Sequence, residues 1–153
     1  MIADALVLFG ITGDLAAKSL LPALYRLAKR GDWAWPVIGV TRGGWDVQRL
    51  RERVYECVAA DQGADQIDSD VFARFVDLFR MASVDYDDPA TFATIADHAR
   101  DCRVLALYLA IPPSQYVSVA ASLAAVGLNE SSLLIVRSRS GTTSRRRGRY
   151  RPG

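Results

Sequence analysis

The sequence feature that decides the fold is the stretch Phe9-Gly10-Ile11-Thr12-Gly13-Asp14-Leu15-Ala16. It connects an apolar run at residues 4–9, which is typical of a buried strand, with a segment of helical periodicity. In a strand-turn-helix unit of this kind the first glycine permits a tight turn, and the second lets the backbone approach a pyrophosphate. The small residue lets the helix lie close to the strand, and the helix N-terminus offers N–H groups to a phosphate. The stretch therefore indicates a dinucleotide-binding turn.

The spacing of its small residues is G-x-x-G-x-x-A, because position 8 is leucine and the stricter G-x-G-x-x-G would need glycine there. The spacing by itself also fits an ordinary turn followed by a helix cap, so this alternative stays open at this point. The location between the first strand and the following helix favours the nucleotide-binding interpretation.

Strands and helices alternate through residues 1–136. Short apolar runs predict further strands at residues 36–41, 81–84, 103–110 and 132–136. Periodicity and capping residues predict helices at residues 14–30, 71–79 and 114–126, and helices that begin at Asp46 and Asp88. This order predicts an α/β fold with a Rossmann-like, doubly wound parallel sheet. The sheet would be incomplete after its fifth strand, which would leave a strand edge exposed.

Two local features refine this prediction. Pro22 lies inside the first predicted helix and should kink it, because proline lacks an N–H donor. The helix that follows Asp46 should turn one apolar face inward, formed by Val47, Leu50, Val54 and Val58.

The second strand runs directly into a cation, in the order Gly39-Val40-Thr41-Arg42. NAD enzymes place a carboxylate at the end of this strand for the ribose, and a carboxylate would repel a 2′-phosphate. The planar donors of an arginine suit that phosphate instead. Arg42 alone could equally be a solvated loop residue, but together with the glycine turn it predicts a preference for NADP over NAD.

Charge divides the chain into two segments. Residues 137–153 hold seven of the 19 basic residues and none of the 17 acidic ones, so residues 1–136 carry 12 basic against 17 acidic side chains. The C-terminal segment shows no periodicity, and its only apolar or ring side chains are Tyr150 and Pro152. It cannot offset its ordering entropy by burial, so we expect a disordered, arginine-rich tail after a domain formed by residues 1–136.

Composition excludes several classes of protein. No apolar run approaches the length of a membrane helix, and residues 1–4 carry no basic leader. Cys57 and Cys102 lie far apart and follow no metal-ligand spacing, so we expect a cytoplasmic protein with no metal site and no disulfide. His98, the only histidine, is expected on a solvated helix face. The acids at Asp85, Asp87 and Asp88 are interpreted as the start of a helix.

Three blocks of this sequence resemble the glucose-6-phosphate dehydrogenase family, in order and in spacing. The first is the Gly-Asp-Leu-Ala turn at residues 9–16, followed by Lys18 and by Leu-Pro-Ala-Leu-Tyr at residues 21–25. The second is Asp-Tyr-Asp-Asp at residues 85–88, and the third is Leu-Tyr-Leu-Ala-Ile-Pro-Pro at residues 107–113. The resemblance covers residues 4–136.

The resemblance implies an oxidoreductase of the pentose phosphate pathway and of glucose metabolism, which oxidises glucose 6-phosphate with NADP to the lactone. It implies cofactor contacts in three places. Residues 10–15 (Gly10, Ile11, Thr12, Gly13, Asp14 and Leu15) would hold the phosphates, and Arg42 would pair with the 2′-phosphate. Tyr108, Ala110 and Pro112 would lie near the nicotinamide. The family's catalytic histidine and its oligomer contacts belong to a later part of those proteins, so no catalytic residue is assigned here and the oligomeric state stays open.

Two positions depart from the family pattern. Gly43 replaces the hydroxyl residue that usually follows the arginine, which should weaken the phosphate pocket, and Met81 stands where tyrosine is common. Lys18 is interpreted as a surface charge in preference to a phosphate ligand.

The resemblance breaks off after Val136, where the family continues with Glu-Lys-Pro-Phe-Gly. Codons can be chosen for residues 136–153 such that one base inserted after the codon of Val136 restores this motif and a plausible helix behind it. We therefore infer a one-base deletion, in the gene or in its sequencing, and expect the arginine-rich tail to be out of frame. The chain would then be inactive by itself.

Two other functions compete with this interpretation. One is a truncated nucleotide-binding module that holds NADP and catalyses nothing. The other is a nucleic-acid binder that uses the arginines of residues 137–153, which is disfavoured because Tyr150 is the only aromatic residue there for stacking on bases.

Overall fold

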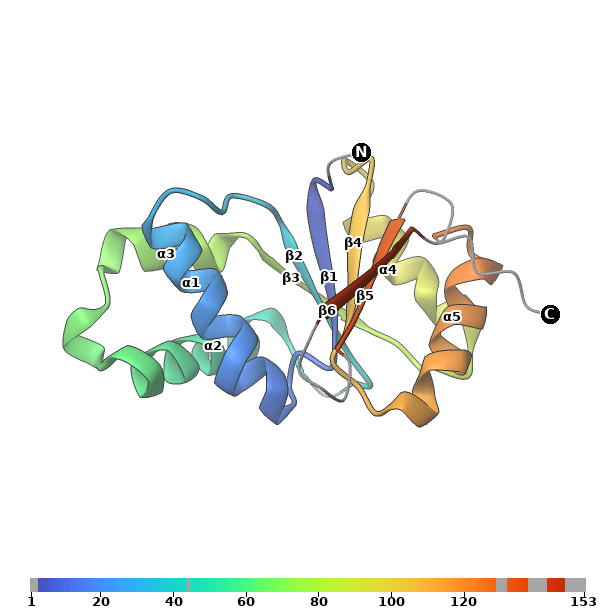
Figure 1. Ribbon diagram of the computed structural model, residues 1–153, viewed down its shortest axis with the longest axis horizontal. Coiled ribbons are helices and arrows are strands. Elements are labelled where there is room, and N and C mark those ends of the chain that lie inside the picture. The colour runs from blue at the N-terminus through green and yellow to red at the C-terminus, as the bar shows by residue number, and fades with distance from the viewer. Residues whose placement is uncertain (1–2, 44, 129–131, 138–142, 148–153) are drawn as a thin grey trace.

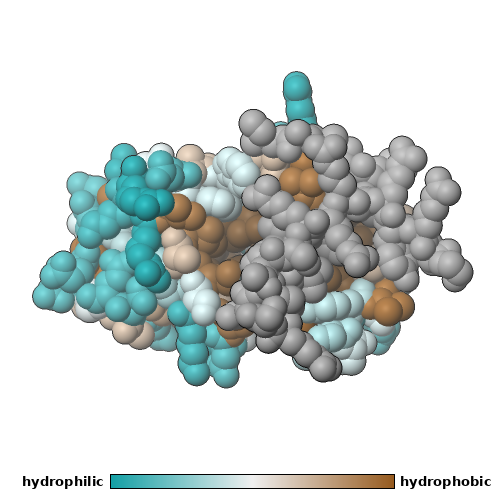
Figure 2. Space-filling view, viewed as in Figure 1, coloured by the Kyte–Doolittle hydropathy of each residue, from teal (hydrophilic) through white to brown (hydrophobic). Residues whose placement is uncertain are grey.

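The computed structural model describes residues 3–43, 45–128, 132–137 and 143–147 of the chain. The strands form one sheet in the middle of the molecule, with helices on both sides (Figure 1). Helices α1 (Leu21–Lys29), α2 (Val47–Gln62) and α3 (Ser69–Asp77) lie on one side, and α4 (Ala93–His98) and α5 (Tyr116–Ala125) lie on the other. On the face shown in Figure 2, hydrophilic side chains gather over the layer of α1, α2 and α3, while apolar side chains lie toward the middle.

The sheet has the strand order β3-β2-β1-β4-β5-β6. Its strands are β1 (Ala5–Phe9), β2 (Val37–Thr41), β3 (Phe79–Ser83), β4 (Leu105–Leu109), β5 (Ser132–Arg137) and β6 (Thr143–Arg147). The first five pair in parallel, so the doubly wound α/β prediction is confirmed. The order reverses between β1 and β4, and ligands of such sheets bind at this switch point, outside the carboxyl ends of the strands.

Strand β1 is central in the sheet, since it pairs with β2 and with β4, and both of its faces are buried. Its residues Leu6 and Leu8 face the core beneath α1, α2 and α3, whereas Val7 and Phe9 face the core beneath α4 and α5. All five side chains of β1 are buried, in agreement with the near-continuous apolar run that a parallel strand covered on both faces requires. Each large side chain buried in this way contributes about 1.5–3 kcal/mol.

The first predicted helix changes its type just before Pro22, where a kink was expected. Asp14 and Leu15 are helical, Ala16–Leu20 form a π-helical turn, and α1 begins at Leu21 with Pro22 in its first turn. A proline costs least at this position, since the first N–H groups of a helix have no acceptor within it. The widened turn before Pro22 thus lets the helical path continue through the proline.

Two predictions about the helices are wrong in detail, one about the inward face of α2 and one about the end of α3. Asp46 does cap α2 by accepting a hydrogen bond from the N–H of Arg49, but Val47 is 36% exposed and not part of the inward face. The buried face of α2 is formed by Leu50, Val54, Cys57 and Val58, so it includes Cys57 and leaves out Val47. Phe79 fits the helical spacing of α3 but is the first residue of β3, since α3 ends at Asp77. A single apolar residue at a junction satisfies both periods, and packing decides between them.

The arginine-rich segment contains a strand, which corrects the expectation of disorder for part of it. Residues Thr143–Arg147 form β6 and pair antiparallel with β5, from Leu133 opposite Arg147 to Arg137 opposite Thr143. Strand pairing uses backbone groups, so the exposed edge of β5 can accept an extended segment that has no apolar face of its own. The remaining residues of the expected tail, 138–142 and 148–153, lie outside the described residues.

None of the helices in the described part of the chain is long and apolar enough to cross a membrane. Among the same residues Cys57 and Cys102 are both free thiols.

Candidate functional site

Three of the predicted contact regions lie at one edge of the sheet. The glycine turn follows β1, Arg42 follows β2, and Ala110 follows β4. Because these strands are parallel neighbours in the order β2-β1-β4, their carboxyl ends meet at the same edge. The structure therefore brings together segments that are separated by about thirty to one hundred positions in the sequence.

The glycine turn is closed by backbone hydrogen bonds and by a close contact. The N–H of Gly13 donates to the carbonyl of Gly10 at 2.9 Å, and the N–H of Gly10 donates to Val40 of β2 at 3.2 Å. Gly10 has φ +81°, a conformation that favours glycine, and a Cβ there would overlap the carbonyl oxygen of Ala110. Gly10 is required both for the turn and for the close packing of β1 against the end of β4.

The turn leaves backbone donors for an anion. Among the described hydrogen bonds, none uses the N–H groups of Thr12, Asp14 or Leu15. Asp14 and Leu15 begin the helical segment that continues as α1, and Thr12 lies in the turn just before it. Unpaired N–H groups and the helix dipole at such a helix start favour a phosphate. Gly13 and Asp14 are exposed, so a ligand can approach the turn from solvent. These N–H groups are donors that could hold the pyrophosphate of a dinucleotide.

The cation at the end of β2 is exposed and rests on an aromatic ring. The guanidinium carbon of Arg42 lies 4.8 Å from the centroid of the Tyr86 ring. Arg42 makes no hydrogen bond or ion pair with any described residue. A guanidinium that stacks by its face keeps the N–H donors in its plane, and these donors match the oxygens of a phosphate.

The residues predicted near the nicotinamide follow the path of β4. Tyr108 lies within β4 and is half-buried, opposite Leu8 of β1. Ala110 comes directly after the strand, and its N–H donates to the carbonyl of Phe9 at 3.0 Å. Pro112 is exposed and leads into the short helix Pro113–Gln115. Ala110 thus lies against the glycine turn, Pro112 lies just beyond it, and Tyr108 is placed further back along the strand.

One residue of the site was missed by sequence reasoning. A Cβ on Gly39 would lie 2.7 Å from Cδ1 and 3.1 Å from Cγ2 of Ile11, and 3.3 Å from Cδ2 of Leu50. Gly39 therefore leaves the space in which Ile11, the fully buried residue of the turn, packs between β2 and α2. A glycine inside an apolar strand is a recognisable signal of such a close approach.

A hollow of about 430 Å³ opens beside the turn, between Thr12 and α2. Its other lining residues are Trp45, Arg49, Glu52, Arg53 and Glu56. The guanidinium of Arg49 stacks on the ring of Trp45 at 4.2 Å. Because two carboxylates accompany the two guanidinium groups, this hollow carries no net positive charge. Arg42 remains the better placed cation for a 2′-phosphate.

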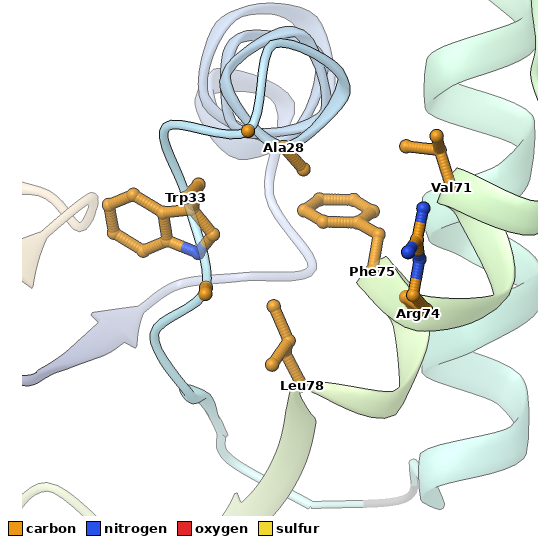
Figure 3. Close-up of a pocket in the computed structure, with 8 residues that line it drawn as sticks. Ala28, Trp33, Val71, Arg74, Phe75 and Leu78 are labelled. Atoms are coloured by element: carbon orange, nitrogen blue, oxygen red, sulfur yellow. The ribbon is translucent and has the colours of Figure 1, made fainter.

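A second pocket, of about 280 Å³, lies at the opposite edge of the sheet and is not part of this site (Figure 3). Phe75 and Leu78 point toward it from α3 and from the residue before β3, and Trp33 lines it from the loop before β2. These segments stand at the amino ends of the strands, whereas the glycine turn stands at the carboxyl ends. Its walls are mainly apolar, and Arg74 is the charged group among the residues that line it.

Asp88 takes the structural role that the sequence predicted, whereas His98 is partly buried and not on a fully solvated face. Asp88 caps the short helix Pro89–Phe92 by accepting from the N–H of Ala90, and Asp85 accepts from the N–H of Asp87. No cluster of metal-ligating side chains occurs among the residues that the structure describes. His98 ends α4, and its carbonyl accepts a hydrogen bond from Arg80.

Comparison with known proteins agrees with this geometry. Residues 7–139 match a family model described as glucose-6-phosphate dehydrogenase, NAD binding domain. The chain is 38% identical over 141 residues to glucose-6-phosphate 1-dehydrogenase of Mycolicibacterium smegmatis, covering 85% of this chain and 28% of the relative. It is 31% identical over 128 residues to the enzyme of the same name from Zymomonas mobilis, covering 82% and 26%.

Two solved structures resemble the fold of this chain. The crystal structure of glucose-6-phosphate 1-dehydrogenase from Mycobacterium avium matches with a TM-score of 0.82 and 34% identity, over 92% of this chain and 31% of that one. A glucose-6-phosphate dehydrogenase in complex with its substrate glucose-6-phosphate matches with a TM-score of 0.74 and 25% identity, over 86% and 29%. The chain thus spans less than a third of the length of the relatives that it matches.

Proposed function

The chain belongs to the glucose-6-phosphate dehydrogenase family and matches its nucleotide-binding domain, and on this premise we propose that it binds NADP in preference to NAD. The single observation that carries the preference is Arg42, an exposed guanidinium at the carboxyl end of β2 that no described residue neutralises. The donors of the glycine turn would hold the pyrophosphate common to both cofactors. Arg42 would meet the 2′-phosphate, the group that NAD lacks.

Each predicted contact residue has a part in this proposal. The N–H groups of the segment 10–15 would bind the pyrophosphate. Ala110 and Pro112 would border the nicotinamide, and Tyr108 would support that border from within β4. Bound nicotinamide would accept the hydride, and the residues of this chain would hold it against the end of β4.

The test is a titration of the full chain with NADP and with NAD, repeated with Arg42→Ala. Loss of charge-assisted hydrogen bonds should weaken NADP binding by about 1.5–3 kcal/mol and leave NAD binding nearly unchanged. Arg49→Ala is the matched control, because Arg49 is also an exposed arginine stacked on an aromatic ring near the turn. Equal affinities of the unmodified chain for both cofactors would refute the proposal.

The wider activity that this domain would serve is oxidation of glucose 6-phosphate to 6-phosphogluconolactone. The relatives named above carry that activity in their names, and one of them is described with glucose 6-phosphate bound. The reaction also needs a base at the sugar hydroxyl. The only histidine of this chain, His98, is the last residue of α4 and does not belong to the segments around the glycine turn. We therefore propose that this chain holds the cofactor and catalyses nothing by itself.

We further propose that the residues after Val136 are read out of frame. Seven arginines within 17 residues differ sharply from the acidic composition of residues 1–136. Sequencing the gene around codon 136 tests the frame directly. Reduction of NADP by glucose 6-phosphate, assayed with this chain and with the product of a gene carrying one added base, tests the activity. Turnover by the 153-residue chain would refute the proposal of inactivity.

A further inference from the structure

Tyr86, the residue beneath the exposed side chain of Arg42, is itself part of the core. Tyr86 is 4% exposed and belongs to the core beneath α4 and α5. Its ring packs against the ring of Phe9, with centroids 6.2 Å apart and an interplanar angle of 56°. Its backbone carbonyl accepts a buried hydrogen bond of 2.9 Å from the hydroxyl of Ser122 on α5. Both the ring and the backbone of Tyr86 are therefore fixed by the core.

The same contacts connect Arg42 with the glycine turn. Phe9 is the last residue of β1 and precedes Gly10, so one ring contact joins the start of the turn to the platform under Arg42. The backbone around the platform is tied as well, because the N–H of Val84 donates to the carbonyl of Thr41 at 2.8 Å. Tyr86 thus spans from the strand that holds the turn to the residue that follows β2.

The chemistry of the ring suits this role. Burial raises the pKa of the Tyr86 hydroxyl, although the charge of Arg42 partly opposes the effect. The ring therefore stays neutral at physiological pH, and its electron-rich face attracts the guanidinium. A free arginine side chain loses rotamer entropy when a ligand orders it, and a preformed stack reduces that loss.

We propose that Tyr86 is a positioning residue for NADP selectivity: it holds the guanidinium of Arg42 at the edge of the sheet so that the planar N–H donors are ready for the 2′-phosphate. This inference rests on the proposed function, since it assumes that Arg42 reads that phosphate. It assigns selectivity to a residue that would not touch the cofactor. It also accounts for how the site could work without a hydroxyl residue at position 43, since preorganisation can offset a missing donor.

The experiment uses the full chain and two probes that differ by one phosphate, adenosine 2′,5′-bisphosphate and AMP. The variants are Arg42→Ala, Tyr86→Leu, Tyr86→Phe, and the double variant of Arg42→Ala with Tyr86→Leu. Tyr86→Leu should bind the bisphosphate about 3- to 10-fold more weakly and AMP unchanged. Tyr86→Phe keeps the ring and should retain the selectivity. In the double variant, Tyr86→Leu should have no further effect.

Unchanged AMP binding shows that each variant keeps its folded site. If Tyr86→Leu does not fold, Tyr86→Met, whose flexible unbranched side chain adapts to the space without a ring, replaces it and is held to the same expectation. The inference is overturned if Arg42→Ala removes the selectivity while Tyr86→Leu, or Tyr86→Met in its place, retains it. It is overturned too if Tyr86→Phe loses the selectivity. If Arg42→Ala itself retains the selectivity, the proposed function has failed, and the role of Tyr86 fails with it.

Discussion

The carbonyl oxygen of Ala110 occupies the place where a side chain on Gly10 would begin. The two residues follow neighbouring parallel strands, and the N–H of Ala110 donates to Phe9 just before the turn. The contact fixes how closely the end of β4 approaches the glycine turn. Backbone conformation and packing therefore both require glycine at position 10.

Replacing Gly10 by alanine should therefore cost more than a positive φ alone explains. Gly31 is the matched control, because its φ of +82° is nearly that of Gly10, +81°, but nothing lies within 4 Å of a Cβ there. Gly31→Ala should lower the free energy of unfolding by about 1 kcal/mol, and Gly10→Ala by at least about 2 kcal/mol more. Urea denaturation of both variants measures the difference. Similar losses would show that the contact with Ala110 relaxes easily.

Replacing Gly39 by alanine should affect the turn from beneath. The added methyl group would push on Cδ1 of Ile11, the flexible end of a side chain, so the fold should survive with a loss of about 1–3 kcal/mol. Displacement of Ile11 should also weaken cofactor binding, because Ile11 lies within the turn. Combining Gly39→Ala with Ile11→Val, which removes that terminal methyl, should restore part of both losses. Thermal denaturation and NADP titration provide the two measurements, and the absence of any rescue would count against this contact.

Asp4 should make the stability of the domain depend on pH. Its carboxylate accepts hydrogen bonds from the N–H groups of Arg103 at 2.9 and 3.1 Å and of Val104 at 3.0 Å, and these bonds lower its pKa below the ordinary 3.8. A carboxyl group whose pKa is lowered in the folded state stabilises the fold at pH values above its ordinary pKa. This contribution is lost as the pH falls through the lowered pKa of the folded state.

Asp4→Asn should accordingly lower the urea midpoint at neutral pH, and the difference from the unmodified chain should shrink as the pH drops below 3.8. Asp97→Asn serves as the control, since Asp97 is exposed and its ion pair with Arg100 lies on the surface. A difference for Asp4→Asn that does not change between neutral and acid pH would contradict the assigned role of the carboxylate.

The hydroxyl of Tyr25 should stabilise the start of α3. Tyr25 is fully buried, and its hydroxyl oxygen accepts a hydrogen bond of 3.0 Å from the N–H of Asp68, which caps α3. Tyr25→Phe leaves that donor unpaired and should cost about 1–2 kcal/mol. Tyr55→Phe is the matched control: Tyr55 also packs against Phe72, but it is 43% exposed and its hydroxyl has no described hydrogen bond. Equal unfolding free energies for the two variants would refute the prediction.

The sequence by itself determined the fold class, the turn and its place in the chain. Apolar runs of strand length that alternate with amphipathic segments allow few architectures other than a parallel α/β sheet, and glycine with a following small residue is a local requirement of the turn. Asp46 and Asp88 were identifiable as caps for the same reason, since a cap acts over two or three residues of chain.

Only the tertiary structure decided which distant residues meet. No local pattern places Tyr86 under Arg42. The stack forms because β2 and β3 are parallel neighbours, so the residues that follow the two strands come close together. The pairing of β6 with β5 was equally hidden, since it uses backbone groups at a free edge and needs no side-chain periodicity. Val47 was misplaced because periodicity describes a face of a helix but not where its packing ends. Contacts within a few residues are determined by local stereochemistry, whereas contacts across the sheet depend on how the whole chain packs.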